Sequence, residues 1–465
     1  MNENVKRFID DFSNKLISNK ASFFIGSGIS RSAGYVGWSE MLDDKAREIG
    51  LDINKEYDLI SLAQYYVNAN KRAKINHSIS SFFDDNNGNP TKTHSLLCNM
   101  PFSSIWTTNY DSLLERQLRN NDILYNVITN DYSYRNINNN AKVTVYKIHG
   151  TYSSPNECVL TRDDYEKYHL THDIVLSQLK AEMCSKSFLF LGYGFRDTDI
   201  NHILSNIRQI YDDSMPHQHY CIMKKVSIDE NGVRKSEEQF LYETKKEEHF
   251  ISDMKNYGIE TILINDFNEI DDILMTIRRK TYSKNVLISG SCDEIDDNIF
   301  NITTHLTSLL VKKGYKIYTG YGKNIGNMIV EGYFSGCSTR VTSPVTKFSE
   351  AIKIIPFPFK NKSNKKDEIY YKLRKSMAEL TTIQIVIAGK GKINDGTYNE
   401  YTLSKEKKNL IIPIGITGGT AKLIWDEIFK EFSEDVSEEF KQLNLSSDAE
   451  LIVSAIFRMI ERGQL

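Results

Sequence analysis

Short apolar segments that end in a polar or glycine-rich turn recur along this chain, and segments with helical periodicity separate them. In the first half, these apolar segments end at Gly26-Ser27-Gly28, Thr107–Asp111, His149-Gly150 and Gly192-Tyr193-Gly194. Such an alternation predicts a parallel sheet with helices on its faces. Because ligands bind beyond the carboxyl ends of parallel strands, we expect the four turns to converge on one crevice.

The same alternation starts again near residues 280–285, with turns at Gly290-Ser291, Thr319–Gly322 and Gly389–Gly391. We therefore predict two α/β domains, residues 1–282 and residues 283–465, each with a Rossmann-type parallel sheet. Residues 39–100 have helical periodicity and are predicted to form helices inserted between the first strand and the next.

Composition argues against several classes of protein. The net charge of the 465 residues is -3, so no basic field favours a nucleic-acid partner. No apolar run approaches the ~20 residues of a membrane span, and the first residues do not have the pattern of a signal peptide. The six cysteines stand singly, without the Cys-x-x-Cys pairs of a zinc ribbon. We expect a cytoplasmic protein without a metal, a membrane or a nucleic acid.

The first turn has features of a phosphate-binding loop. Gly26 and Gly28 allow the backbone to turn tightly and to approach an anion, and the amides of the following helix would face it. Ser30 is a candidate helix N-cap or phosphate donor, and Ser27 lies between the two glycines. Since Gly-x-Gly also occurs in many ordinary turns, a turn without a ligand is the alternative.

Two polar residues at later strand ends are candidate catalytic groups. A neutral imidazole at His149 would take a proton from a water molecule or a ribose hydroxyl, and Asn109 would orient that hydroxyl or water. The alternatives are structural. A lone histidine often serves only packing, and either Asn109 or Asp111 is a suitable cap for a helix over residues 112–118.

Together these turns resemble the motifs of the sirtuin family. Gly26–Ser30 is similar to the sirtuin Gly-Ala-Gly-Ile-Ser, Thr108–Asp111 to Gln-Asn-x-Asp, Ile148–Gly150 to the catalytic His-Gly, and Gly192–Gly194 to the glycine turn beside the NAD ribose. The resemblance covers about residues 5–280. It implies catalysis by Asn109 and His149, and NAD binding by the following residues: Gly26, Ser27, Gly28, Ser30, Asp111, Gly192, Tyr193 and Gly194.

Two departures from the sirtuin pattern concern the reaction. Arg31–Trp38 stands where deacylating sirtuins have Gly-Ile-Pro-Asp-Phe-Arg, and the four zinc-binding cysteines are absent. The resemblance therefore implies a bacterial sirtuin-like enzyme that hydrolyses NAD+ to ADP-ribose and nicotinamide without a metal, rather than a protein deacylase.

The second half carries a separate set of candidate ligand-binding residues. Arg374 has the forked guanidinium that suits phosphate, Lys390 supplies a point charge, and Glu400 would accept hydrogen bonds from ribose hydroxyls. The glycines and small polar residues expected beside them are Gly290, Ser291, Gly320, Gly322, Gly396 and Thr397. The alternative is that the glycines only shape turns and that Arg374 pairs with a surface acid.

Gly396-Thr397-x-x-Glu400 resembles the Gly-Thr-x-x-Glu of phosphoribohydrolases in the SLOG superfamily, although Ala388–Gly391 replaces their Pro-Gly-Gly. A sirtuin-like domain followed by a SLOG domain is similar to the effectors of Thoeris anti-phage defence. This resemblance implies that a cyclic ADP-ribose isomer, made by a TIR-domain partner, binds the second domain and activates NAD+ depletion. It also implies a homotetramer or filament. A non-catalytic NAD or ADP-ribose sensor and a nucleoside monophosphate phosphoribohydrolase are the alternatives.

Overall fold

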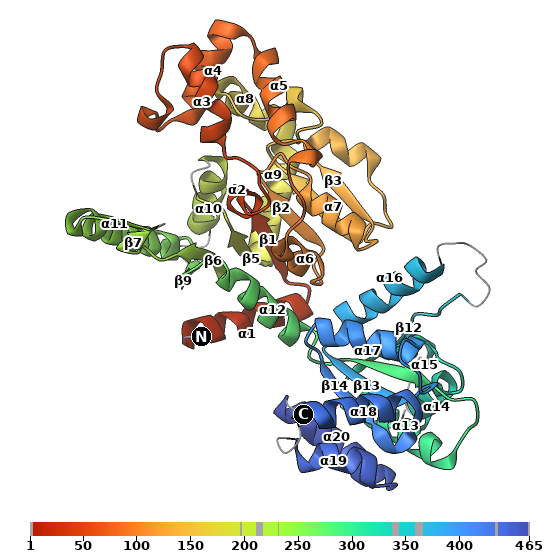
Figure 1. The fold of residues 1–465 in the computed structure, drawn as a ribbon. Coiled ribbons are helices and arrows are strands. Elements are labelled where there is room, and N and C mark those ends of the chain that lie inside the picture. Colours follow the sequence, from red (N-terminus) through yellow and green to blue (C-terminus); the bar gives the residue numbers. More distant parts are fainter. Residues whose placement is uncertain are drawn as a thin grey trace. The chain divides into compact units, whose positions relative to one another are not determined.

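The computed structural model describes residues 3–195, 198–210, 217–230, 232–336, 344–358, 366–432 and 436–463. The chain divides into two compact units, Met1–Thr281 (unit 1) and Tyr282–Leu465 (unit 2). Each unit is an α/β structure built around its own parallel sheet, as the sequence predicts (Figure 1).

The sheet of unit 1 has seven strands in the order β3-β4-β2-β1-β5-β6-β9. Every neighbouring pair in this sheet is parallel. The strands are β1 Ala21–Ile25, β2 Ser104–Thr107, β3 Tyr125–Ile128, β4 Val143–Lys147, β5 Ser187–Leu191, β6 His219–Lys224 and β9 Ile259–Ile264. β1 and β5 are buried along their whole length, as expected of central strands covered on both faces.

Helices cover both faces of this sheet. The apolar cluster on one face includes residues of α1, α6, α7 and α12, and the cluster on the other face includes residues of α9, α10 and α11. The bounds of these helices are α1 Glu3–Ile17, α6 Lys92–Cys98, α7 Leu113–Asn120, α9 Tyr168–Ser185, α10 Thr198–Ile210, α11 Glu237–Asn256 and α12 Glu269–Thr281.

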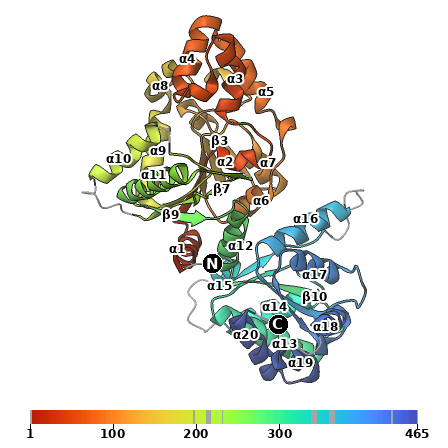
Figure 2. The ribbon, with the colours of Figure 1, turned by 60° about the vertical axis from the view of Figure 1, so that its left-hand side comes forward.

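The predicted inserted helices form a small cluster with a core of its own. The cluster contains α3 Trp38–Glu48, α4 Leu59–Asn70 and α5 Arg72–Phe82, and α8 Arg162–Glu166 packs beside it (Figures 1 and 2). A carboxylate begins α4, because Asp58 accepts a hydrogen bond from the Ser61 amide at 3.0 Å. Helical periodicity runs on from Tyr57 to Phe83, but Lys71 has φ +76° and separates α4 from α5.

Unit 2 has a five-stranded parallel sheet in the order β12-β11-β10-β13-β14. Its strands are β10 Asn285–Ser291, β11 Lys316–Thr319, β12 Ile352–Ile354, β13 Ile383–Ala388 and β14 Leu410–Ile414. Its helices are α13 Asp297–Lys312, α14 Ile325–Gly336, α15 Pro344–Ala351, α16 Lys366–Glu379, α17 Gly396–Glu406, α18 Gly419–Phe432, α19 Glu438–Leu445 and α20 Ala449–Arg462. The described buried residues of this unit form one apolar cluster around the sheet.

The structure differs from the sequence-based expectation in three elements. The edge strand β3 was not expected, because it is short and only half-buried along most of its length. The sequence pattern predicts a charged turn and a helix over residues 226–250, but this segment begins with a small antiparallel hairpin, β7 Asp229–Glu230 and β8 Val233–Arg234. The sequence pattern predicts one helix at the end of the chain, but the structure has two, α19 and α20. Asp448 ends the turn between them and caps α20, because its carboxylate accepts a hydrogen bond from the Leu451 amide.

Candidate functional site

The four predicted turns of unit 1 follow four neighbouring strands, β4, β2, β1 and β5. Within the sheet, β2 is the neighbour of β1 on one side, and β5, which comes later in the chain, is its neighbour on the other side. The strand order therefore reverses between β1 and β5, and open α/β sheets bind ligands at such a point. The structure brings all four turns to the carboxyl edge around this reversal.

Glycines allow the turns after β1 and β5 to touch. The Gly28 amide donates a hydrogen bond to the Gly192 carbonyl at 3.0 Å, and Gly192 has φ +63°. A Cβ atom at Gly26 would lie 2.3 Å from the Gly192 carbonyl oxygen. The Gly28 amide, predicted to face a phosphate, thus joins two turns. The side of the loop open to a ligand is formed by Ser27 and Gly28, which are both exposed.

Gly26→Ala is expected to lower the free energy of unfolding of the full chain by roughly 2 kcal/mol, because the new methyl group meets backbone rather than a movable side chain. Gly194→Ala is the matched control in the neighbouring turn. Gly194 is exposed, and nothing lies within 4 Å of a Cβ placed there. Denaturant unfolding of both variants checks this expectation, and equal stability of the two would contradict the close packing described above.

A hydrogen-bonded group of three side chains connects the turn after β1 to the turn after β2. The Ser30 hydroxyl lies in α2 Ser27–Arg31, donates to Asp111 Oδ2 at 2.7 Å and accepts from Asn109 Nδ2 at 2.9 Å. The other carboxylate oxygen of Asp111 accepts the Leu113 amide at the start of α7 at 3.1 Å. The N-cap position of α2 belongs to Gly26, so the N-cap role suggested for Ser30 is wrong. Of the two candidate caps for this helix, Asp111 rather than Asn109 accepts a hydrogen bond from a backbone amide of α7.

Asn109 is held so that one of its polar atoms stays available. Its backbone amide donates to Thr107 Oγ1 at 3.0 Å, and its side-chain nitrogen donates to Ser30. Its Oδ1 atom is buried and has no hydrogen-bond partner among the residues that the structure describes. Buried polar atoms are nearly always paired, so this oxygen is suited to accept a hydrogen bond from a bound hydroxyl or water.

Aromatic side chains surround the His149 ring. Its side chain is buried, and its ring centre lies 6.2 Å from that of Trp38 and 5.7 Å from that of Tyr165. Trp38 begins α3 and also stacks on Tyr110, in the turn after β2, at 6.2 Å and 7°. The inserted helices thus supply one wall beside His149. We did not identify Trp38 as a site residue, although a large aromatic so soon after the glycine turn was a usable signal.

Two predicted residues of the fourth turn are placed differently from the others. The Tyr193 ring packs against the apolar cluster beneath α9, α10 and α11, 4.7 Å from the ring of Phe24, so only the backbone of Tyr193 reaches the turn beside Gly26. Gly194 is exposed in open space. The structure therefore brings Gly192 into the site, but not the Tyr193 side chain or Gly194.

In unit 2 the strand order reverses between β10 and β13. Gly290 and Ser291 end β10, and the turn after β11 crosses them so closely that a Cβ atom at Gly322 would lie 2.0 Å from the Gly290 carbonyl oxygen. These three predicted residues therefore lie together at the carboxyl edge. This close crossing accounts for Gly322 without a ligand. Gly290 is accounted for by the neighbouring strand β13, because a Cβ atom at Gly290 would lie 2.0 Å from the Ile387 carbonyl oxygen.

A second group gathers around Arg374, in α16. Its guanidinium lies 4.9 Å from the Phe357 ring centre, and a Cβ atom at Gly396 would lie 3.0 Å from Arg374 Nη2. A Cβ atom at Gly320 would meet Phe357 at 2.4 Å and Glu400 Oε1 at 3.6 Å. The structure thus brings four predicted residues together and adds Phe357, which sequence reasoning missed because two prolines obscure its segment.

Arg374 and Glu400 attract each other without a hydrogen bond. Arg374 Nε lies 3.9 Å from Glu400 Oε1, and this Nε is buried with no hydrogen-bond partner among the described residues. Burial raises the pKa of Glu400 to about 7; Asp395 also raises it, whereas a hydrogen bond from Ser289 and the charge of Arg374 lower it. A buried guanidinium nitrogen facing a partly neutral acid is suited to receive an anionic or hydroxyl-rich ligand.

The start of α17 is not an open phosphate site. The N-cap is Asp395, whose carboxylate accepts the Tyr398 amide at 2.7 Å and the Lys390 amide at 3.0 Å. Thr397 is buried. The Lys390 side chain is exposed. A hydrogen bond from Lys323 and the charge of Lys323 lower the pKa of Asp293, and the charge of Lys390 lowers it further. Only the backbone of Lys390 joins this group.

The raised pKa of Glu400 makes the stability of the chain depend on pH. The folded chain keeps a proton on Glu400 between about pH 4.5 and 7 that the unfolded chain releases, so this contribution is complete below pH 4.5 and lost as pH rises through 7. Glu400→Gln imitates the protonated acid. Its unfolding free energy should equal that of wild type at pH 4 and exceed it by up to about 3 kcal/mol at pH 8.5. An equal difference at both pH values would contradict the shift.

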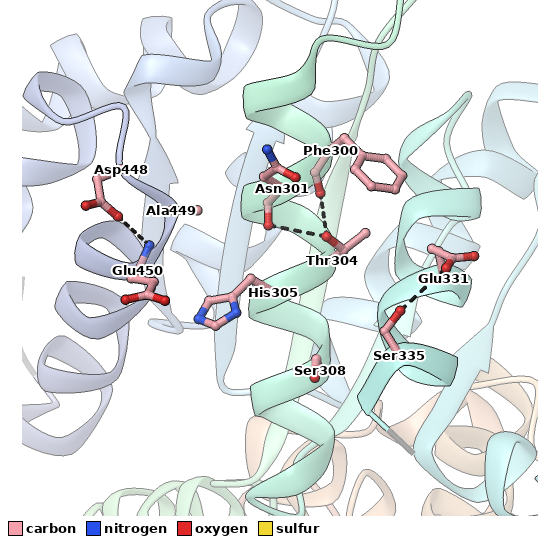
Figure 3. Close-up of a pocket in the computed structure, with 10 residues that line it drawn as sticks. All are labelled: Phe300, Asn301, Thr304, His305, Ser308, Glu331, Ser335, Asp448, Ala449 and Glu450. Carbon is pink, nitrogen blue, oxygen red and sulfur yellow. Dashed lines mark hydrogen bonds between the residues drawn. The ribbon is translucent and has the colours of Figure 1, made fainter. Parts of the chain in front are cut away.

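A further groove of about 590 Å³ lies elsewhere in unit 2, between α13, α14 and the start of α20 (Figure 3). His305 and Glu331 are among its lining residues, and it includes none of the residues predicted to bind a ligand. Within the described ranges, no group of three His, Cys, Asp or Glu side chains is placed to hold a metal ion. Among all the residues that the structure describes, in both units, no helix is long and apolar enough to cross a membrane.

Comparison with known proteins bears on both units. Residues 103–251 match the family model described as a SIR2-like domain, and residues 269–463 match the Sir2- and TIR-associating SLOG family. Fold and site thus define a two-domain protein that joins a SIR2-like unit to a SLOG unit.

Relatives named NAD(+) hydrolase ThsA match nearly the whole chain. The relative from Bacillus cereus (strain MSX-D12) is 34% identical over 444 residues, which cover 93% of this chain and 91% of the relative. The one from Enterococcus faecium is 33% identical over 94% of this chain and 93% of the relative. The one from Acinetobacter baumannii (strain 532279) is 32% identical over 95% of each. The chain belongs to the NAD(+) hydrolase ThsA family.

Proposed function

We propose that this chain hydrolyses NAD+ to ADP-ribose and nicotinamide at the carboxyl edge of the sheet of unit 1. The observation that carries this proposal is the geometry of Asn109. Ser30 fixes its amide, and its Oδ1 atom is left without a partner among the described residues, in the turn adjoining the strand of His149. The printed name of the relatives supports the same reaction.

In this proposal, the bond between the ribose C1′ and the nicotinamide nitrogen breaks. Nicotinamide leaves with the bonding electron pair, and the oxygen of a water molecule adds to C1′. Asn109 Oδ1 accepts a hydrogen bond from the ribose or the water, and His149 takes the proton that the water loses. The carboxylate of Asp111 stabilises the positive charge that develops on the ribose. Ser27 and the exposed backbone of Gly28 border the diphosphate.

Product analysis with the full chain tests this reaction. Incubation with NAD+ should yield nicotinamide and ADP-ribose in equal amounts. Recovery of intact, bound NAD+ after long incubation, with or without activator, would favour a non-catalytic sensor instead.

We further propose that unit 2 controls this activity by binding a cyclic ADP-ribose isomer, which a TIR-domain partner makes. Support comes from the buried Arg374 Nε, from Glu400 beside it, and from the description of the SLOG family as Sir2- and TIR-associating. The guanidinium would bind the diphosphate of the isomer, and Glu400 would accept a ribose hydroxyl. In the cytoplasm of an infected cell, the activated chain would deplete NAD+ and abort infection. We propose that it acts as a homotetramer or a filament.

One observation favours a second activity for unit 2, hydrolysis of a nucleoside monophosphate. A carboxyl with a pKa of about 7 next to an arginine is suited to acid–base work on a ribose. Against this stands the loop Ala388–Gly391, which lacks the Pro-Gly-Gly of the phosphoribohydrolases. Release of free base from a nucleoside monophosphate by the full chain, lost in Glu400→Gln, would establish it.

A further inference from the structure

A buried ion pair lies beneath the candidate hydrolysis site. Lys147 ends β4 and Glu115 lies in α7, and Lys147 Nζ is 3.1 Å from Glu115 Oε1. The two side chains are only 1% and 8% exposed. Neither residue belongs to the sirtuin-like motifs, and the reaction proposed above does not use them.

The ammonium of Lys147 also donates a hydrogen bond to the backbone carbonyl of Asp111. Lys147 stands two residues before His149 and pairs with Thr107 in the register of β2 and β4. One charged group thus connects the strand that carries His149 to the turn that carries Asn109 and Asp111.

Packing alone gives little reason for this arrangement. Two buried charges lose their hydration, and apolar side chains of similar size often stabilise a protein as well or better. A buried ammonium with two fixed acceptors does, however, define one position for the backbone that it holds.

We infer that Lys147, paired with Glu115, is a positioning residue for NAD+ hydrolysis: it fixes the Asn109–Asp111 turn relative to His149. This inference rests on the proposed function. It predicts that loosening the contact lowers kcat far more than it changes KM, since small displacements of reacting groups cost roughly 100-fold in rate.

The decisive variant is Lys147→Met with Glu115→Leu, which removes both charges and keeps the volume. In the full chain, assayed with NAD+ and saturating cyclic ADP-ribose isomer, kcat should fall roughly 100-fold. KM should change by no more than a few-fold, and the unfolding midpoint should stay near that of wild type. Glu115→Gln retains an acceptor for Lys147 and should keep kcat within a few-fold of wild type.

A matched control lies at the opposite, amino end of the same sheet. Lys186 Nζ is 3.2 Å from Glu182 Oε1 and also donates to Ser104, the first residue of β2. Lys186→Met should lower stability but leave kcat unchanged.

Four outcomes would overturn the inference: normal kcat in the folded double variant, a fall in Glu115→Gln as large as in the double variant, an equal fall in Lys186→Met, or a loss that appears only in KM. If the double variant does not fold, Lys147→Gln with Glu115→Gln replaces it. This pair also removes both charges and shortens the side chain that reaches the Asp111 carbonyl, so a normal kcat in it would equally overturn the inference. A wild-type chain that leaves NAD+ intact under all conditions would refute the proposed function itself, and this inference with it.

Discussion

In the full chain, His149→Ala should lower kcat for NAD+ hydrolysis by about 1,000-fold at saturating activator, because a positioned general base contributes between 10² and 10⁴ in rate. The imidazole lies buried at the carboxyl end of β4, within the ring of aromatic side chains that includes Trp38. Its removal leaves no group in this position to accept the proton of the attacking water. Initial rates of nicotinamide release, measured across NAD+ concentrations, check the expectation.

His172 provides the matched control for this variant. It is also buried in unit 1, but both of its ring nitrogens have partners: Thr171 Oγ1 at 2.7 Å and the Thr129 carbonyl at 2.8 Å. His172→Gln should reduce stability and leave kcat close to wild type. If His149→Ala keeps full activity, or if both variants lose activity equally, the role assigned to His149 is wrong.

The second large effect concerns the response to the signal. Arg374→Ala should raise the isomer concentration that gives half-maximal activation by roughly 10- to 100-fold, since hydrogen bonds to charged groups are worth ~1.5–3 kcal/mol. Arg374→Lys should restore little of the response to the isomer, because an ammonium cannot reproduce the planar, forked guanidinium between Phe357 and Glu400. Activation curves with each cyclic ADP-ribose isomer measure the effect.

Lys372, in the same helix, is the control. It is exposed and pairs with Glu368 at 3.3 Å, four residues earlier. Lys372→Ala removes the same charge from α16 and should leave the activation curve unchanged. A normal response in Arg374→Ala, or a loss of equal size in Lys372→Ala, would show that the signal binds elsewhere.

The alternation of strands and helices was enough to predict both sheets, because each central strand is a short apolar run that ends in a glycine or polar turn. β5 is such a run, and Gly192 follows it directly. Elements without such a run were harder to recognise. β3 is a half-buried edge strand, and the break between α4 and α5 depends on a positive φ at Lys71 that lysine rarely adopts.

For the site, the sequence predicted which turns would meet but not how their side chains would pair. Ser30 is bonded to Asn109 and Asp111, residues about eighty positions away, and no local pattern identifies such partners. Asp395 shows the opposite case, since an acid before Gly396 is a recognisable helix cap that competes with a phosphate. Lys147 also left a signal, because it is the one charged residue of β4 and directly precedes Ile148 and His149.

The most direct test of the central claim is NAD+ hydrolysis by the purified full chain, with and without each cyclic ADP-ribose isomer. We predict that one isomer raises the rate and that nicotinamide and ADP-ribose then accumulate in equal amounts. The response should shift to higher isomer concentration in Arg374→Ala, and hydrolysis should be nearly absent in His149→Ala. NAD+ that stays intact in the presence of every isomer, with the wild-type chain folded, would contradict the account.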